Sequence, residues 1–121
     1  MQKPTRQEEA IATVLRKNKI DFHIHKPLKV GEVTFVCDFV IGDLPIAIEA
    51  KCLNTKYRTK ALISELAYKA VRIKRFYPKA KLIAVLNRSA TITASEKLVL
   101  KEEFDSLVFD DELEKLANEI S

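Results

Sequence analysis

The sequence predicts an α/β domain in which helices flank a mixed central sheet, and three observations support this class. Short apolar runs of strand length alternate with longer segments whose apolar residues have helical spacing. A chain of 121 residues fits one domain with a proper core, so we expect a single domain over residues 1–121. A hydrophobic content of 47% with 31% charged residues is typical of globular proteins.

A helix is expected over residues 5–18. Thr5 is a good N-cap, and Glu8 follows it at the spacing of a capping box. The apolar stripe of the helix includes Ile11 and Leu15. Glu8 lies three residues before Ile11 and seven before Leu15, so its side chain is expected to project toward the interior.

Three strands are expected next, over residues 22–28, 34–41 and 46–53. The first alternates apolar and polar residues, as in a half-buried strand, and the other two are strongly apolar. Turns at residues 31–32 and 42–43 contain glycine and separate the strands. The three strands are therefore predicted to form an antiparallel meander.

A long helix, capped by Asn54 and Thr55, is expected to run to about Tyr77, where Pro78 stops it. The spacing of its apolar residues is helical, at steps of four, four, three and four positions: Leu62, Leu66, Ala70, Ile73 and Tyr77. A strongly apolar fourth strand follows over residues 81–86. After residue 86, a C-terminal extension of a helix, a strand and a helix is expected.

The extension begins with a polar loop in which residues 90–93 can form a short strand. Ser95 is expected to cap a helix that runs to about Phe104, and residues 106–109 form a fifth strand. Asp111 and Glu114 have the spacing of a capping box for the last helix, whose inner face is formed by Leu113, Leu116, Ala117 and Ile120.

Three charged residues interrupt the apolar second and third strands: Asp38, Glu49 and Lys51. A buried charge without a partner costs several kcal/mol, so something is expected to bind them. Glu49 and Lys51 are two residues apart and face the same way, and Asp38 is close to Glu49 in an antiparallel register. Two carboxylates suit Mg²⁺ or Mn²⁺, beside which Lys51 can orient or deprotonate water.

The alternative is a structural role, in which Asp38 and Lys51 form a cross-strand pair and Glu49 lies on a solvated face of the sheet. The residues that flank these charges are too apolar for a solvated strand. The metal site is therefore the better interpretation.

Asp38, followed by Glu49-Ala50-Lys51 between apolar strands and after an N-terminal helix, resembles the PD-(D/E)xK nuclease superfamily. The resemblance covers residues 5–86 and implies the restriction-endonuclease-like αβββαβ core. It also implies that Asp38, Glu49 and the Ala50 carbonyl bind the metal and that Lys51 is the catalytic lysine. Glu8 matches the glutamate that many members carry on the first helix. Cys37 replaces the proline of the motif name.

Within the superfamily, the short length and the position of Glu8 are most similar to archaeal-type Holliday-junction resolvases. Glu8 also has a purely structural interpretation, as the capping partner of Thr5. His23 and His25, together with the two cysteines, fit no zinc spacing. We expect the histidines to be exposed on their strand, near a phosphate.

Positive charge is concentrated directly after the strand pair, since residues 51–81 contain ten basic side chains and one acidic side chain. An ordinary surface helix carries acidic and basic residues in similar numbers, and this segment does not. The excess of positive charge predicts contact with a polyanion. The nucleic-acid-binding candidates are Lys56, Arg58, Lys60, Lys69 and Arg72, of which Lys60 and Lys69 are placed nearest the site. The alternative is a solvated helix face.

Together these features predict a Mg²⁺-dependent DNA endonuclease, with Mn²⁺ as a substitute ion, acting on duplex or branched DNA. Asp38, Glu49, Lys51 and Glu8 are the catalytic candidates. A homodimer is expected, because cutting both strands needs two sites, with the C-terminal helix as a candidate interface. No signal segment or membrane span is evident, so we expect an intracellular, cytoplasmic protein.

Two rival functions remain open at this point. One is a non-catalytic nucleic-acid-binding or assembly module that keeps the nuclease fold, although such relatives usually lose one of the three site residues. The other is a metal-independent RNA-processing domain of similar topology, which would not need the carboxylate pair.

Overall fold

The centre of the protein is a five-stranded mixed sheet with the order β1-β2-β3-β4-β5. The computed structural model describes residues 4–42, 46–53 and 59–120. The pairs β1–β2 and β2–β3 are antiparallel, and β3–β4 and β4–β5 are parallel, which confirms the meander and the mixed sheet. The strands are β1 (His23–Val30), β2 (Val33–Ile41), β3 (Ile46–Lys51), β4 (Lys81–Leu86) and β5 (Ser106–Phe109).

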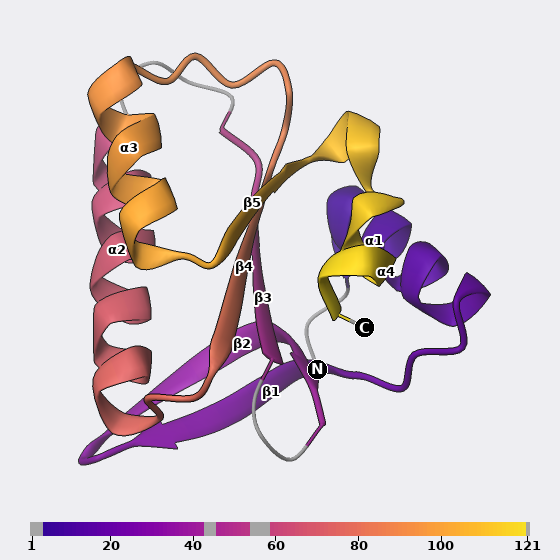
Figure 1. The fold of residues 1–121 in the computed structure, drawn as a ribbon, viewed down its shortest axis with the longest axis horizontal. Helices are drawn as coiled ribbons and strands as arrows, with labels where there is room; N and C mark the ends of the chain where they lie inside the picture. Colours follow the sequence, from indigo (N-terminus) through magenta and orange to yellow (C-terminus); the bar gives the residue numbers. More distant parts are fainter. Residues whose placement is uncertain (1–3, 43–45, 54–58, 121) are drawn as a thin grey trace.

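Helices cover both faces of this sheet, α2 and α3 on one side and α1 and α4 on the other (Figure 1). Within the described residues, no helix combines the length and the apolar character needed to cross a membrane. The helices are α1 (Arg6–Lys17), α2 (Thr59–Phe76), α3 (Ala94–Glu103) and α4 (Lys115–Ile120), and a short 3₁₀ turn, η1 (Asp110–Glu112), precedes α4.

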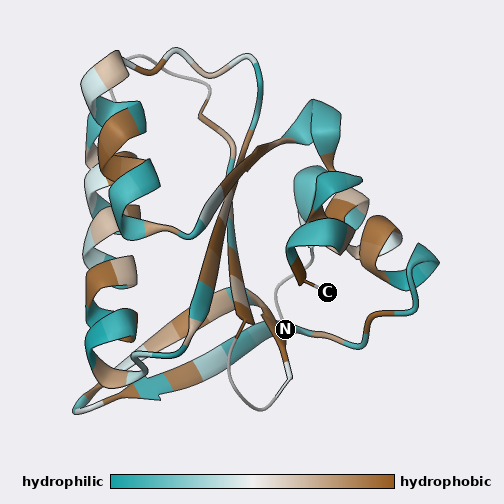
Figure 2. Cartoon of the chain, viewed as in Figure 1, coloured by the Kyte–Doolittle hydropathy of each residue, from teal (hydrophilic) through white to brown (hydrophobic). Residues whose placement is uncertain are grey.

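Each face of the sheet has its own apolar core. On β4, Leu82, Ala84 and Leu86 pack toward α2 and α3, whereas Ile83 and Val85 pack toward α1 and α4. Figure 2 shows the corresponding pattern, with β4 and β5 largely hydrophobic and hydrophilic residues on the outer helix surfaces. A strand buried on both faces is a continuous apolar run, which explains why residues 81–86 were predictable.

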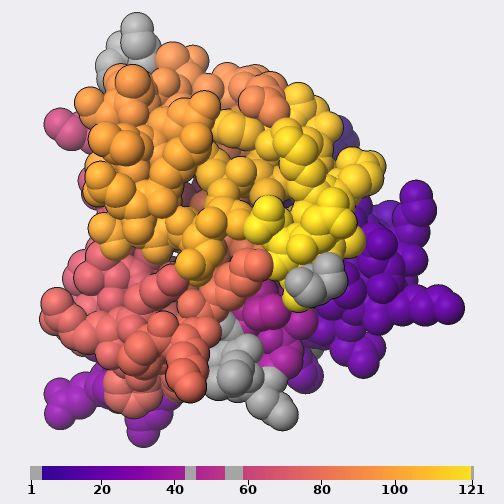
Figure 3. Space-filling model, viewed as in Figure 1, coloured from indigo at the N-terminus to yellow at the C-terminus, as the bar shows by residue number. Residues whose placement is uncertain are grey.

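In the space-filling view, α2, α3 and the C-terminal segment form one face of the molecule, and the N-terminal segment lies at its edge (Figure 3). The inner face of the C-terminal helix, a candidate dimer interface, is not available at the surface. Leu113 and Leu116 are buried within the chain, where they pack with Ile11 and Leu15 of α1. These apolar side chains are therefore already used by the core.

Two polar side chains hold the ends of β4 in place. Asn87 is buried and pairs with the backbone of Leu53, accepting from its N–H at 2.7 Å and donating to its carbonyl at 3.2 Å. Asp105 accepts from the Leu82 N–H and from Lys74 Nζ, both at 2.8 Å. These contacts link β4 to the end of β3 and to α2.

The prediction that Ser95 caps α3 is wrong, because Thr93 is the N-cap. The Thr93 hydroxyl accepts from the Glu96 N–H at 3.1 Å, and the Glu96 carboxylate accepts from the Thr93 N–H at 2.8 Å. This complete capping box starts the helix at Ala94. Residues 90–93 form no strand.

The capping box predicted at Asp111 and Glu114 is also absent. The Asp111 carboxylate instead accepts from Arg88 Nε at 3.0 Å, so it is not available to a helix N-terminus. The Phe109 N–H is bound by the Glu112 carboxylate at 3.2 Å, which closes the 3₁₀ turn before α4 begins at Lys115. The predicted caps of the long helix, Asn54 and Thr55, lie outside the described residues.

Candidate metal centre

The candidate site lies where β2 and β3 separate. Their backbone pairing covers only Phe39–Ile41 of β2 and Ile46–Ile48 of β3. At the next position the Asp38 N–H donates to the Glu49 carboxylate at 3.0 Å, and the Ala50 N–H donates to the Asp38 carboxylate at 2.8 Å. The two side chains thus satisfy backbone donors that the sheet no longer pairs. The predicted proximity of Asp38 and Glu49 is confirmed.

Glu8 reaches this point from α1, where it is the predicted capping partner of Thr5 and also lies beside the other site candidates. Its Oε1 accepts from the Thr5 N–H at 2.9 Å, and the Thr5 hydroxyl accepts from the Glu8 N–H at 3.1 Å, which completes a capping box. Its Oε2 lies 3.0 Å from His25 Nε2. With only 5% of the residue exposed, Glu8 is both a cap and a buried site residue.

His25 was predicted to be exposed on its strand, and this is wrong, because it is half-buried beside Glu8. It lies between the register pairs Ile24–Phe39 and Lys26–Cys37, and so opposite Asp38. Its φ of 52° is in the left-handed region. Such a conformation costs a non-glycine residue about 1–3 kcal/mol and is concentrated at functional sites. The turn at residues 31–32 already implied this register, so the pairing was available from the sequence.

Glu8, His25 and Asp38 together offer three possible metal ligands, whose donor atoms all lie within 4.8 Å of one another. This is a mixed set of two carboxylates and one imidazole, which suits a divalent ion. The donor chemistry therefore fits a divalent ion, and the two carboxylates are the part of it that suits Mg²⁺.

The electrostatics of the three groups differ. Burial, followed by the nearby charge of Glu49, raises the pKa of Asp38 to about 7. Burial alone would also raise the pKa of Glu8, but hydrogen bonds from Thr5 and His25 outweigh it and hold this pKa below its ordinary value. Of the two carboxylates, Asp38 is thus the one whose charged form burial disfavours on balance.

Glu49 is 3% exposed and faces α2 rather than the group formed by Glu8, His25 and Asp38. Its Oε1 accepts no well-directed hydrogen bond among the described residues, and its charge is met by an ion pair with Lys69 Nζ. Lys69 also donates to the Val36 carbonyl at 2.6 Å. The Lys69 ammonium group of α2 therefore lies next to Glu49, on the α2 side of the carboxylate pair formed by Asp38 and Glu49.

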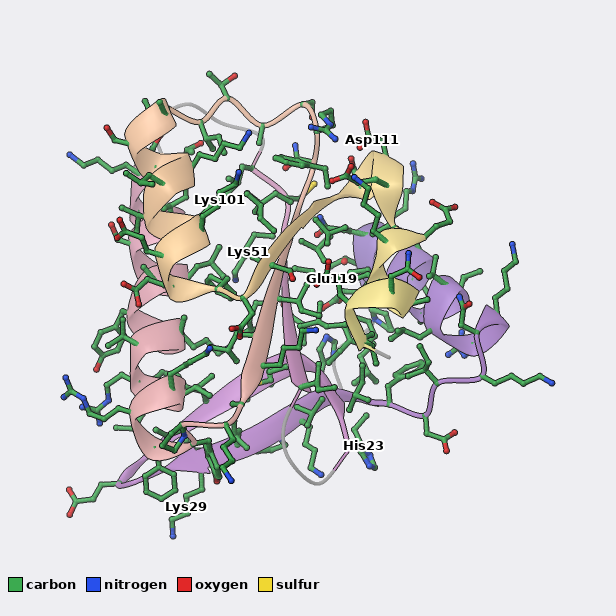
Figure 4. The ribbon with its side chains drawn as sticks, in the orientation of Figure 1. His23, Lys29, Lys51, Lys101, Asp111 and Glu119 are labelled. Atoms are coloured by element: carbon green, nitrogen blue, oxygen red, sulfur yellow. The ribbon has the colours of Figure 1, made fainter. Side chains whose placement is uncertain are left out.

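An open pocket of about 500 Å³ gives access to the site. Gln7 Nε2 donates to the Lys51 carbonyl at 3.1 Å and so joins α1 to the end of β3. Figure 4 shows Lys51 on β3, between the sheet and the helices. The pocket brings together the predicted Glu8, Asp38, Ala50 and Lys51 with Thr5, Arg6, Gln7, His25, Val36 and Cys52.

Cys37 lies in the core between the sheet and α2, next to the Glu49 charge. Burial, followed by that charge, raises the pKa of its thiol to about 12. The thiol is therefore protonated at neutral pH and is a poor metal ligand. This finding agrees with the absence of any zinc spacing in the sequence.

The predicted nucleic-acid-binding residues are not gathered at one place. Lys56 and Arg58 lie outside the described residues. Lys60 is exposed at the start of α2 and lines a second pocket, of about 450 Å³, with residues that precede and begin α3. Arg72 is half-buried and lines a small pocket beside the β1–β2 turn. Lys69 is nearest the site, as predicted, but it is bound to Glu49.

Part of the basic charge after Lys51 is compensated within the protein. Lys74 pairs with Asp105 at 2.8 Å, and Lys81 pairs with Glu119 of α4 (Figure 4 labels Glu119). With Lys69, three of the basic side chains in residues 51–81 thus have acidic partners. The excess that faces solvent is smaller than the sequence indicates.

Comparison with known proteins adds no identification. No protein-family model matches the chain, and no curated protein is detectably similar to it. What can be stated is an α/β fold with the order α1-β1-β2-β3-α2-β4, extended by α3, β5 and α4 around a mixed five-stranded sheet.

Proposed function

We propose that this protein is a metal-dependent endonuclease of the PD-(D/E)xK superfamily that hydrolyses phosphodiester bonds in DNA. The observation that carries the proposal is the convergence of Glu8, Asp38 and Lys51, from three different elements, on one open pocket. Glu49 adjoins them through its hydrogen bond to the Asp38 N–H. Buried carboxylates around an accessible pocket can hold a divalent ion of the kind that assists phosphodiester hydrolysis.

Asp38 and Glu8, with the Ala50 carbonyl, are the groups that would hold Mg²⁺ or Mn²⁺. Glu49, which the sequence also predicted as a ligand, faces α2 and would act through its hydrogen bond to the Asp38 N–H. A bound ion of this kind would stabilise negative charge on the reacting phosphate and favour an ionised water. Lys51 would orient or deprotonate the attacking water and offset charge on phosphorus. In-line attack would break the bond from phosphorus to the 3′ oxygen, which takes a proton, and leave 5′-phosphate and 3′-hydroxyl ends.

Recognition of DNA would depend on backbone phosphates and on DNA shape, as in a nicking or junction-resolving enzyme. The candidates for phosphate contact are Lys60 and Arg72, together with Lys56 and Arg58. A homodimer would supply the two sites that cleavage of both strands requires, and light scattering would detect it.

Cleavage assays test the proposal directly. Purified protein is incubated with supercoiled plasmid, linear duplex, a four-way junction, single-stranded DNA and RNA, each with Mg²⁺, Mn²⁺ or EDTA. We expect metal-dependent cutting of DNA that Asp38→Ala abolishes and Lys51→Ala reduces by about 10²-fold or more. Lys29→Ala, on exposed β1, is the matched lysine control and leaves cleavage unchanged.

Two outcomes contradict the nuclease. One is the absence of metal-dependent cleavage on every substrate, and the other is cleavage that persists in both site variants. DNA binding without cleavage favours the non-catalytic module, whereas cutting of RNA in EDTA favours the metal-independent RNA-processing domain. A junction cut no faster than linear duplex removes only the junction-resolving version.

A further inference from the structure

The two histidines of the chain have different environments, although both lie on β1. His23 is exposed, as Figure 4 also shows at the edge of the molecule. The His25 side chain is only 20% exposed and points into the pocket that contains Glu8 and Asp38. The alternation of an ideal strand would place both on one face, so a local backbone change sets His25 apart.

That backbone change is the left-handed conformation of His25, with φ at 52°. It interrupts the β1–β2 pairing at one position, between Ile24–Phe39 and Lys26–Cys37. Left-handed backbone is unfavourable for histidine, so the surrounding sheet must compensate its cost. The direct result is that Nε2 lies 3.0 Å from Glu8 Oε2, beside Asp38.

The donor atoms of Glu8, His25 and Asp38 span at most 4.8 Å. This span is close to twice a metal–ligand bond of about 2.1 Å, so the three groups surround a volume of the size of one ion. Glu8 is also fixed by its second oxygen, which Thr5 binds, so its Oε2 has a defined position. The arrangement resembles a set of ligands more than a surface ion pair.

We propose that His25 is a third side-chain ligand of the divalent ion, beside Glu8 and Asp38, and that its nitrogen makes the site prefer Mn²⁺ to Mg²⁺. The inference rests on the proposed function in that it assigns the metal to the same pocket. Mg²⁺ takes oxygen ligands almost exclusively, whereas imidazole is a good ligand for transition ions. Two carboxylates alone would give little discrimination between the two ions.

The simplest alternative is that His25 only neutralises the buried Glu8. The two roles differ in measurable ways, because a neutralising group affects stability but does not bind the ion. His25→Gly is the best variant, since glycine adopts the left-handed conformation without strain and the fold is expected to persist. His23→Gly on the same strand is the matched control, and circular dichroism with thermal melting checks both.

Calorimetric titration with MnCl₂ and MgCl₂ measures the preference without any nucleic acid. We expect the wild-type protein to bind Mn²⁺ at least tenfold more tightly than Mg²⁺. His25→Gly should lose about 10-fold or more in Mn²⁺ affinity, with less than about threefold change for Mg²⁺. Pulsed EPR of bound Mn²⁺ should show coupling to an imidazole ¹⁴N that is present in His23→Gly and absent in His25→Gly.

Equal Mn²⁺ affinity in the wild-type and His25→Gly proteins overturns the inference, as does the absence of ¹⁴N coupling or of any Mn²⁺ binding. Asp38→Asn should also lose the ion, which places it in this pocket. Because these readouts need no substrate, they separate the two proposals. Histidine-dependent Mn²⁺ binding without cleavage of DNA or RNA would contradict the nuclease and leave the metal site intact.

Discussion

The side chains of Asp38 and Glu49 each accept a backbone N–H from the opposite strand, at the point where β2 and β3 separate. The Asp38 N–H donates to the Glu49 carboxylate at 3.0 Å, and the Asp38 carboxylate accepts from the N–H of Ala50, the next residue after Glu49. The Asp38 side chain, which would hold a metal, therefore also completes the sheet together with Glu49. Substitutions at these positions must be chosen so that loss of charge and loss of a hydrogen-bond acceptor can be distinguished.

We expect Asp38→Asn and Asp38→Ala to differ in stability although both abolish metal binding. The asparagine carbonyl can still accept from the Ala50 N–H, so the free energy of unfolding should change by less than about 1 kcal/mol. Alanine leaves that buried donor without an acceptor, which should cost about 1–3 kcal/mol. Urea denaturation measures the difference, and Mn²⁺ titration measures binding.

Equal stability of the two Asp38 variants would show that the hydrogen bond to Ala50 contributes nothing in solution. Retained Mn²⁺ binding in Asp38→Asn would remove Asp38 from the metal site. The two measurements are independent, so one role can fail without the other.

Lys69→Met should destabilise the protein by about 3 kcal/mol, because it leaves the buried Glu49 carboxylate without its cation. Lys60→Met, on the same helix but exposed, should change the free energy of unfolding by less than about 0.5 kcal/mol. Adding Glu49→Gln to Lys69→Met should restore part of the loss. A double-mutant cycle measured by urea denaturation gives the coupling between the two residues. Strictly additive effects would contradict a direct pair.

The partner of Lys69 could not be predicted from the sequence. The sequence placed Lys69 near the site together with Lys60, and the basic context predicted contact with a phosphate. Which strand residue it meets depends on how far the helix is shifted along the sheet, and no residue pattern specifies that shift. The structure pairs it with Glu49, so a cation predicted to bind nucleic acid lies inside the site.

The strands were predictable because each local signal agreed with the others. Glycine-containing turns at residues 31–32 and 42–43 set the register, and the apolar runs then brought Asp38 beside Glu49. The caps of α3 and α4 were less predictable, because several polar residues compete as caps in the loops before them. The left-handed φ of His25 was not predicted, because few non-glycine residues adopt it and no glycine or turn pattern marks this position.

Asp105 should make the stability of the protein depend on acid pH. Burial alone would raise its pKa, but the hydrogen bonds from Lys74 and the Leu82 N–H hold this pKa below its ordinary value. A carboxylate whose pKa is lowered by folding stabilises the folded state above its unfolded pKa of about 3.9 and loses this contribution as pH falls through the folded value. Thermal melts of the wild-type protein and Asp105→Asn from pH 7 to pH 2 should therefore differ by a constant amount above about pH 5, and the difference should shrink as the pH falls below about 4. A constant difference over the whole range would mean that the charge of Asp105 is not involved.

Lys60 and Arg72 should contribute phosphate contacts that salt weakens. Removing one phosphate contact lowers the slope of log K against log salt concentration by about 0.9 on duplex DNA, so Lys60→Ala with Arg72→Ala should reduce it by about 2. Fluorescence anisotropy with labelled duplex measures the slope, in an Asp38→Asn background that prevents cleavage. Lys101→Ala, exposed on α3 in the acidic part of the chain, is the matched control and should leave the slope unchanged. If the slope also stays the same in the double variant, DNA does not contact this part of α2, and Lys56 and Arg58 become the residues to change next.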